Sequence, residues 1–369
     1  MAMGTSQMLG CLTERLQDVS KDATLTCFGQ EFNPETYAIA KADMLIKGGN
    51  ASGMKYGDTL SDDAFSGYEF DYVISNPPFG IDWKREKSQV EAEAKRGYDG
   101  RFGPGLPAIS DGQMLFMLNG VKKLKEGSGR MAIIQNGSSL FTGDAGSGAS
   151  EIRRYLIHED LVEAIVQLPT DLFYNTGIST YIWVLTKGKP MSRSGRVQLI
   201  DASKCFVKRR KNIGSKRVDL DDACIDLILK AYEGFDQNEV YTADNLVVES
   251  KVFENDFFGF TKVTVETAQT DANGKPLLKK GKKLPVKGAT DSEIIPLSDD
   301  IDAYMAKNVL PYNPLAYIDP AKDKIGYEIP FTRLFYKFEA PEPSASIFED
   351  IKALEAKETV LMKELFGNA

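Results

Sequence analysis

Strand-like and helix-like segments alternate through the first two hundred residues of the chain. The helix-like segments, in which apolar residues recur at helical spacing, cover residues 8–17, 34–48, 113–125 and 151–157. The strand-like segments, which are short and apolar, cover residues 24–29, 70–75, 130–135, 161–168, 179–187 and 196–203. This alternation favours a doubly wound α/β fold around a largely parallel sheet. Because no helix separates 161–168 from 179–187, we expect antiparallel strands at the far edge of the sheet.

The composition of the sequence and its pattern of apolar residues change after about residue 205. We therefore expect a first domain over residues 1–205, an extension over 206–345 and a terminal amphipathic helix over 346–369. Within the extension, residues 270–290 are poor in apolar side chains and predict a hairpin or a mobile excursion. The terminal helix is predicted by apolar residues at spacings of three, four and seven, namely Ile347, Ile351, Leu354, Leu361 and Leu365.

Composition limits the chemistry open to the 369-residue chain. Its one histidine, His158, excludes sites that need two or three histidines, including most catalytic zinc sites. Its four cysteines form no CxxC pair, which argues against a zinc knuckle or a redox dithiol and suits a reducing compartment. The net charge of −8 argues against a non-specific nucleic-acid coat but allows a local basic groove. With no signal peptide and no apolar run of about 20 residues, we expect a cytoplasmic protein.

One tetrapeptide carries a recognisable chemistry. Asn76-Pro77-Pro78-Phe79 directly follows a predicted strand, at the carboxyl edge where α/β folds place their sites. The Asn76 carboxamide oxygen and the Pro77 carbonyl can each accept one N–H of an exocyclic amine, and so point its lone pair at an electrophile. Phe79 offers a flat face on which an extruded base can stack. This chemistry needs neither a metal nor an imidazole; the alternative is a proline-rich strand exit with a packed phenylalanine.

Two acidic residues precede this tetrapeptide at predicted strand ends. Glu31 follows the strand at 24–29, where a carboxylate can accept hydrogen bonds from ribose hydroxyls. Asp58 ends the next, weaker strand and could accept a hydrogen bond from an adenine amino group. Each of them could equally be a solvated turn residue.

Taken together, the motifs resemble those of one family. FGQEFNPETYAIAKADMLIKG, GDTL and FDYVISNPPFG occur in that order, followed by GRMAIIQNGSSLF, IRRYLI, LPTDLFYNTGIST and GYEIPFTRLFYKFE. This ordered set, which covers nearly the whole chain, resembles the methylation (M) subunit of type I restriction–modification systems. The resemblance implies an S-adenosylmethionine-dependent methyltransferase fold with a mixed sheet, and adenine-N6 methylation of DNA.

The resemblance also implies roles for individual residues. The amine-binding loop would consist of Asn76, Pro77, Pro78 and Phe79. Cofactor contacts would come from Glu31, Asp58 and Asn76, and from the tail of a glycine-rich loop at Gly4 and Thr5. Phe173, in LFYNTG, would flank the flipped base together with Phe79; a core aromatic at a strand edge is the alternative for Phe173.

The chain departs from the family pattern at its start. The pattern has a first sheet strand and an Asp-Pro-x-x-Gly-Thr-Gly-Gly loop, of which only Gly4 and Thr5 have counterparts here, together with Met8 and Leu9. Ser6 and Gln7 replace the glycine pair that lets the backbone approach the cofactor. We therefore expect a sheet without its first strand, and a chain that by itself binds S-adenosylmethionine weakly or not at all.

The remaining features concern partners. The basic runs Lys208–Lys211 and Lys279–Lys283 could contact DNA phosphates or be solvated loops, and His158 is a surface helix-end residue. The terminal helix could pack on its own domain, whereas the resemblance suggests docking on a specificity subunit, in a complex that can include a second M subunit and a restriction subunit. Two rivals stay open: an inactive truncated subunit that keeps assembly and DNA-binding surfaces, and a methyltransferase for protein glutamine or RNA.

Overall fold

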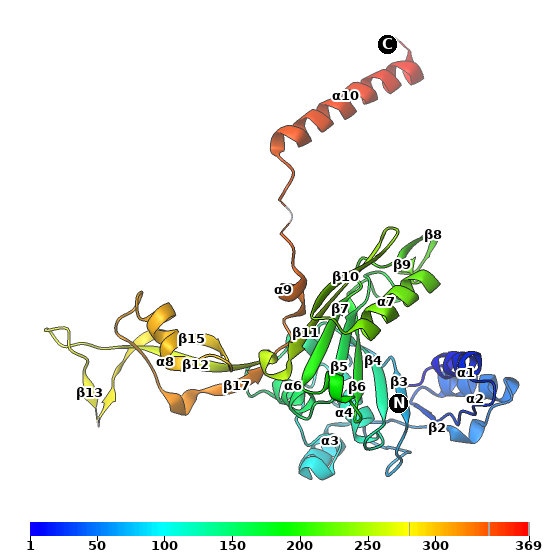
Figure 1. Cartoon of the computed structure of the whole chain (residues 1–369), viewed down its shortest axis with the longest axis horizontal. Helices are drawn as coiled ribbons and strands as arrows, with labels where there is room; N and C mark the ends of the chain where they lie inside the picture. Colours follow the sequence, from blue (N-terminus) through cyan, green and yellow to red (C-terminus); the bar gives the residue numbers. More distant parts are fainter. Residues whose placement is uncertain (280, 339, 368–369) are drawn as a thin grey trace. The chain divides into compact units, whose positions relative to one another are not determined.

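A seven-stranded sheet forms the centre of the computed structural model, in which residues 1–279, 281–338 and 340–367 are described (Figure 1). The strand order is β10-β11-β7-β5-β6-β4-β3. The strands are β3 (Tyr72–Ser75), β4 (Arg130–Asn136), β5 (Val162–Gln167), β6 (Thr180–Thr186), β7 (Arg196–Asp201), β10 (Asn238–Ala243) and β11 (Leu246–Glu254). β3 is parallel to β4 and β5 is parallel to β7, which confirms the predicted α/β class.

The antiparallel strands are placed differently from the expectation. β6 lies inside the sheet, antiparallel to both β4 and β5, because the short connection after β5 turns the chain straight back beside it. The antiparallel edge is instead made by β11 and β10, which pair with β7 and with each other. The sheet therefore continues beyond residue 205, where the sequence predicted that the first domain ends.

Helices pack on the sheet through apolar residues at helical spacing. α4 (Gln113–Lys122) buries Leu115, Met117 and Leu118, whose burial is worth roughly 1.5–3 kcal/mol for each side chain. α7 (Asp222–Gly234) buries Cys224, Leu227 and Ala231 in one cluster with strands β7 and β11. Further helices are α3 (Lys87–Ala94), α5 (Ser138–Phe141) and α6 (Gly148–His158), and short 3₁₀ turns cover Ala51–Gly53, Gly97–Asp99, Met191–Arg193, Asn255–Phe258 and Pro320–Lys322. α3 lies in the segment between β3 and α4.

The N-terminal strands form a pair of their own. β1 (Gly29–Glu31) is parallel to β2 (Met54–Tyr56) in a two-stranded sheet, beside α1 (Gln7–Val19) and α2 (Pro34–Ile46). A cavity of about 610 Å³ lies between residues 24–28 and the segment 70–74 that leads into and forms β3. In the described part of the chain, residues 24–28 have no neighbouring strand at the spacing of about 4.8 Å that ladder hydrogen bonds require. The strand predicted at 24–29 is therefore observed only as β1 at Gly29–Glu31. Among the described residues, β1 and β2 pair only with each other and not with β3 or any other strand of the seven-stranded sheet.

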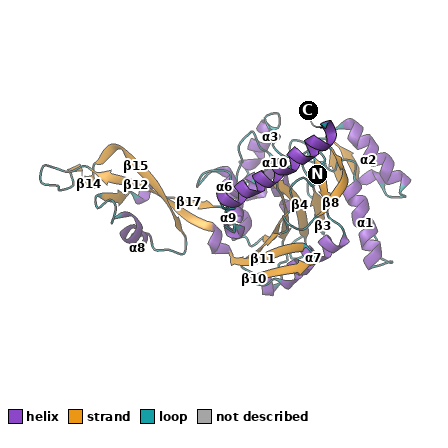
Figure 2. Cartoon of the chain, turned by 90° about the horizontal axis from the view of Figure 1, so that it is seen from above, coloured by secondary structure: helices purple, strands orange, loops and turns teal. Residues whose placement is uncertain are grey.

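Beyond the seven-stranded sheet, residues 259–327 form an extended arm (Figure 2). Its sheet consists of β12 (Gly259–Ala268), β15 (Pro285–Pro296), β16 (Ala316–Ile318) and β17 (Lys324–Tyr327). Val263, Ile295 and Met305 form its core, with α8 (Ile301–Tyr304) and a π-helical turn at Met305–Val309. The hairpin predicted at 270–290 is present as β13 (Leu278–Lys279) and β14 (Lys282–Lys283), although Lys280 lies outside the described residues.

The chain divides into two compact units, Met1–Pro330 and Phe331–Ala369. The second unit contains α9 (Phe331–Phe335) and α10 (Ser344–Phe366), which is the predicted terminal helix; residues 368–369 lie outside the described part. No described residue of α10 is buried. Among the described residues, no helix is both long and apolar enough to cross a bilayer.

Candidate functional site

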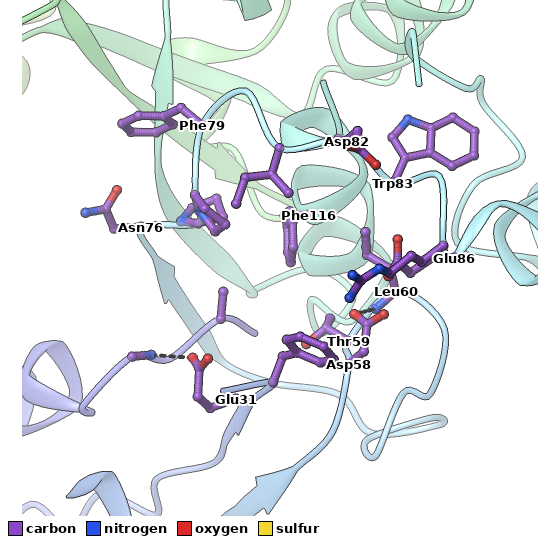
Figure 3. Close-up of a pocket in the computed structure, with 18 of the residues that line it drawn as sticks. Glu31, Asp58, Thr59, Leu60, Asn76, Phe79, Asp82, Trp83, Glu86 and Phe116 are labelled. Carbon is purple, nitrogen blue, oxygen red and sulfur yellow. Dashed lines mark hydrogen bonds between the residues drawn. The ribbon is translucent and has the colours of Figure 1, made fainter. Parts of the chain in front are cut away.

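The Asn76 loop begins where β3 ends, at Ser75 (Figure 3). Two consecutive prolines cannot donate to a ladder, so the strand stops there and the backbone turns away from the sheet. Pro77 is buried, whereas the Asn76 side chain is exposed and makes no hydrogen bond to any described residue. The structure therefore holds the backbone of the loop in place and leaves the Asn76 carboxamide free for a ligand.

A cavity of about 680 Å³ opens beside this loop. Its lining brings together most of the site residues predicted from sequence: Gly4, Glu31, Asp58, Asn76, Pro77, Pro78, Phe79 and Phe173. Thr5 is the exception, since it lines a neighbouring cavity of about 210 Å³ that Asn76 also reaches. The larger volume is in the range of small-molecule and cofactor sites, about 300–1,000 Å³.

Two carboxylates are fixed at strand ends within this cavity. Glu31 accepts hydrogen bonds from the Gly4 N–H and the Asn33 N–H, both at 2.9 Å, and Figure 3 shows the first as a dashed line. Asp58 accepts from the Leu60 N–H at 3.0 Å and the Ser61 hydroxyl at 2.8 Å. Because a carboxylate offers about four lone-pair positions, each retains acceptor capacity for a ligand.

Local sequence explains why these acids lie where they do. Asn33 caps α2 by accepting from the Thr36 N–H at 3.0 Å, and Pro34 supplies the first helical position, so the chain turns sharply just after Glu31. Gly57 has a φ of 146°, which only glycine adopts without strain, and it turns the chain between β2 and Asp58. Both turns keep the acids at the carboxyl ends of the parallel pair.

The start of the chain replaces the family's glycine pair without filling the cavity. Ser6 has a φ of 63° and a ψ of 11°, a left-handed conformation that glycine would adopt more easily. Its side chain is buried and its hydroxyl donates to the Ala40 carbonyl on α2 at 3.4 Å. Gln7 begins α1. Neither residue is among the described ones that line the larger cavity, so their side chains do not obstruct it.

Sequence reasoning missed the outer wall of the cavity, which the 80–116 segment supplies. Trp83 is 2% exposed and its indole N–H donates to the Ala108 carbonyl at 3.0 Å. Glu86 lies near Asp58; burial raises its pKa and the neighbouring Asp58 carboxylate adds to the rise. Phe116 comes from α4. Irregular segments have no hydrophobic periodicity that would mark their buried residues. The one available signal for this wall was Trp83, since the chain has only two tryptophans.

A buried cation holds this segment against the Asp58 loop. Arg101, 8% exposed, donates to the carbonyls of Thr59 at 2.6 Å and Leu60 at 3.0 Å. It also donates to both oxygens of Glu93 on α3, and this pairing lowers the pKa of Glu93 against the opposing effect of burial. Asp63 lies 3.8 Å from the guanidinium and also pairs with Lys123. The wall of the cavity is thus tied to the backbone next to Asp58.

Phe173 fits both interpretations that the sequence left open. It lines the cavity together with Asn76, as expected for a residue that flanks a base. It also packs, partly buried, against the cluster that includes Val166 and Leu168 at the end of β5. Its role in contacting a base stays a prediction.

Comparison with known proteins adds a family to this geometry. Residues 1–273 match the model of the N-6 DNA Methylase family. The chain belongs to that family. It is 28% identical over 215 residues to the type I restriction enzyme MjaIX methylase subunit of Methanocaldococcus jannaschii, covering 58% of this chain and 38% of the relative. It is 28% identical over 290 residues to the HindI methylase subunit of Haemophilus influenzae, covering 77% and 61%.

A solved structure agrees with this membership. The crystal structure of the type I restriction–modification methyltransferase subunit from Streptococcus thermophilus matches 69% of this chain and 49% of its own, with a TM-score of 0.56 and 29% identity. The chain therefore spans less than two thirds of the length of each of these relatives.

Proposed function

We propose that this N-6 DNA methylase family member acts as the adenine-N6 methyltransferase subunit of a type I restriction–modification complex. One observation carries the proposal: the free Asn76 carboxamide opens into the same cavity as the two fixed carboxylates Glu31 and Asp58. An amine-binding loop and a nucleoside-binding edge are thereby within one enclosure. The family match and the methylase subunits among the relatives support this assignment.

In the proposed mechanism, Asn76 and Pro77 bind the amino group of an adenine turned out of the DNA. The Asn76 oxygen and the Pro77 carbonyl accept its two N–H bonds, which withdraws the lone pair from the ring and directs it toward an electrophile. Phe79, half-buried at the end of the loop, stacks on the base and shields one face of it from water. The nitrogen forms a bond to a methyl carbon as that carbon's bond to its donor breaks, and the nitrogen then loses one N–H proton to solvent.

The residues of the cavity fit S-adenosylmethionine as the methyl donor. The carboxylates at the ends of β1 and β2 are acceptors suited to ribose hydroxyls and to an adenine amino group. When bound, the cofactor would supply an electrophilic methyl group on a sulfonium. Ser6 and Gln7 do not line the cavity, so their side chains would not weaken cofactor binding by this chain alone. If binding is weak, the cause would lie elsewhere, such as the second cavity beside β3.

The proposed partners are DNA and a specificity subunit that selects the sequence; a second M subunit and a restriction subunit complete the assembly. α10 is the proposed contact with the specificity subunit. Its apolar residues Ile347, Ile351 and Leu361 are 44–47% exposed, and Leu354 and Leu365 are more exposed, which is unusual for a helix that contacts no other protein.

All four cysteines are free, in agreement with a reducing compartment such as the cytoplasm.

Label transfer tests the function. The chain, with and without its specificity subunit, is incubated with methyl-labelled S-adenosylmethionine and with unmethylated genomic DNA, RNA or protein. We expect label in DNA alone, and a rate at least about 100-fold lower for Asn76→Ala, since loss of one fixed polar contact to a reacting group costs that much. Asn238→Ala, an exposed asparagine on β10, is the matched control. Label in RNA or protein, or an inactive wild-type complex, would support one of the two rivals instead.

A further inference from the structure

A basic hairpin outside the central sheet is attached to the loop that carries Phe173. β8 (Val207–Ile213) and β9 (Lys216–Asp219) pair antiparallel with each other and form a separate two-stranded sheet (Figure 1). Between residues 207 and 219 the basic residues are Lys208, Arg209, Arg210, Lys211, Lys216 and Arg217, against the single acid Asp219. In a chain with a net charge of −8, this is a concentrated local excess of positive charge.

The cations of the hairpin fall into two groups. Arg209 on β8 and Lys216 on β9 both pair with Asp219 on β9, and the Arg209 pair connects the two strands. Four others, Lys208, Arg210, Lys211 and Arg217, are exposed and have no acidic partner among the described residues. Unpaired exposed cations on a two-stranded hairpin stabilise nothing inside the protein, but they can neutralise the phosphates of a nucleic acid.

Backbone contacts fix the hairpin to the loop at 171–176. The Arg217 N–H donates to the Asp171 carbonyl at 2.8 Å, and the Ser215 N–H donates to the Tyr174 carbonyl at 2.9 Å. Gly214, with a φ of 59°, approaches so closely that a Cβ there would lie 2.5 Å from the Tyr174 carbonyl oxygen. The Lys216 ammonium lies 5.3 Å from the centre of the Tyr174 ring. Phe173 and Asn175, on either side of Tyr174, line the cavity that contains Asn76.

We propose that the β8–β9 hairpin binds the phosphate backbone of DNA beside the reacting base, and thereby positions Phe173 at the cavity. The proposal rests on the proposed DNA methyltransferase function and names the surface that holds the substrate. Lys208, Arg210 and Lys211 are the phosphate ligands, and the hydrogen bonds to Asp171 and Tyr174 transmit their position to the loop. Phe173 is the residue that this arrangement presents to the base.

The test compares two triple variants with the same change of charge. Lys208→Gln/Arg210→Gln/Lys211→Gln removes cations from the hairpin. Lys21→Gln/Lys41→Gln/Lys55→Gln removes three exposed lysines near α1, α2 and β2. Affinity for a mixed-sequence DNA duplex is measured over a series of salt concentrations, and circular dichroism with thermal unfolding checks that both variants fold.

We expect the hairpin variant to bind DNA at least about tenfold more weakly at low salt, with a salt dependence shallower by about three units, since each phosphate contact contributes about 0.9 to the slope. The control variant should retain the wild-type slope. Equal losses in the two variants, or an unchanged slope in the hairpin variant, would overturn the proposal. DNA binding is measured without methyl transfer, so a chain that binds DNA through the hairpin but transfers no methyl group would contradict the proposed function alone.

Discussion

Ser6 has a left-handed backbone that costs an L-residue roughly 1–2 kcal/mol relative to glycine. The conformation persists because the segment is fixed on both sides of Ser6. Before it, the Met3 N–H donates to the Gln30 carbonyl at 3.1 Å and the Gly4 N–H donates to Glu31; after it, the Leu9 N–H donates to the Ser6 carbonyl at 3.0 Å. Ser6 thus adopts a left-handed conformation that glycine would favour. Strain retained in this way is a measurable property of the loop.

Ser6→Gly should therefore stabilise the protein. We expect the free energy of unfolding to rise by about 1 kcal/mol, because the relief of strain exceeds the weak hydroxyl bond and the added freedom of the unfolded chain. Urea denaturation measures the change. Ser110→Gly, an exposed serine with ordinary backbone angles, should lower stability slightly. A Ser6→Gly variant no more stable than the wild type would show that the left-handed conformation carries no strain.

The candidate site could be predicted from sequence where residues follow strands. Asn76, Glu31 and Asp58 were placed by the strand ends that precede them, and the structure brings all three to one cavity. Trp83 and Glu86 could not be placed, because they belong to an irregular segment whose position depends on distant contacts of Arg101. Thr5 was assigned to the same site by its sequence neighbourhood, but it lines a separate cavity.

At the scale of elements, Arg101 holds α3 and the cavity wall against the Asp58 loop. Arg101→Gln would leave the partly buried Glu93 without its cation, and would leave the buried Asp63 with Lys123 alone. We expect a loss of about 3–5 kcal/mol in the free energy of unfolding, as for other broken buried pairs. Arg15→Gln, which removes an arginine 71% exposed on α1, should change stability by less than about 0.5 kcal/mol. Chemical denaturation of both variants checks this, and equal effects would contradict a structural role for the buried network.

α10 is the element that we propose contacts the specificity subunit. Leu354→Gln/Leu361→Gln removes two exposed apolar side chains from it without disturbing a core. We expect co-purification with the specificity subunit to fall at least about tenfold, since apolar anchors dominate binding energy, while thermal unfolding of the isolated chain is unchanged. Glu355→Gln/Glu358→Gln is the control on the same helix and should still bind. Undiminished binding by the leucine variant would place the contact elsewhere.

At the scale of the whole molecule, alternation of segments predicts the α/β class but not the order of the strands. β6 was expected at an edge and lies between β4 and β5. β10 and β11, which lie in the extension expected after residue 205, add two strands to the sheet. Strand order depends on which edges remain free after neighbours have paired, and those pairings are non-local, so local patterns in the sequence do not encode them.

The architecture also explains how one chain can supply the separate parts of the proposed site. β1 and β2 are parallel, so Glu31 at the end of β1 and Asp58 just after β2 lie at one edge of their two-stranded sheet. Asn76 follows β3 of the seven-stranded sheet, and all three residues line the same cavity although they are far apart in sequence. The loop after β5 brings Phe173 to the same cavity. The central claim is that the site formed by these residues methylates the amino group of adenine.

Mass spectrometry of nucleosides from DNA incubated with the complex and S-adenosylmethionine tests that claim most directly, because it identifies the atom that carries the new methyl group. The account predicts N6-methyladenine as the product, reduced at least about 100-fold by Asn76→Ala and unaffected by Asn238→Ala. A methyl group on any other base or atom, or a wild-type yield from Asn76→Ala, would contradict it.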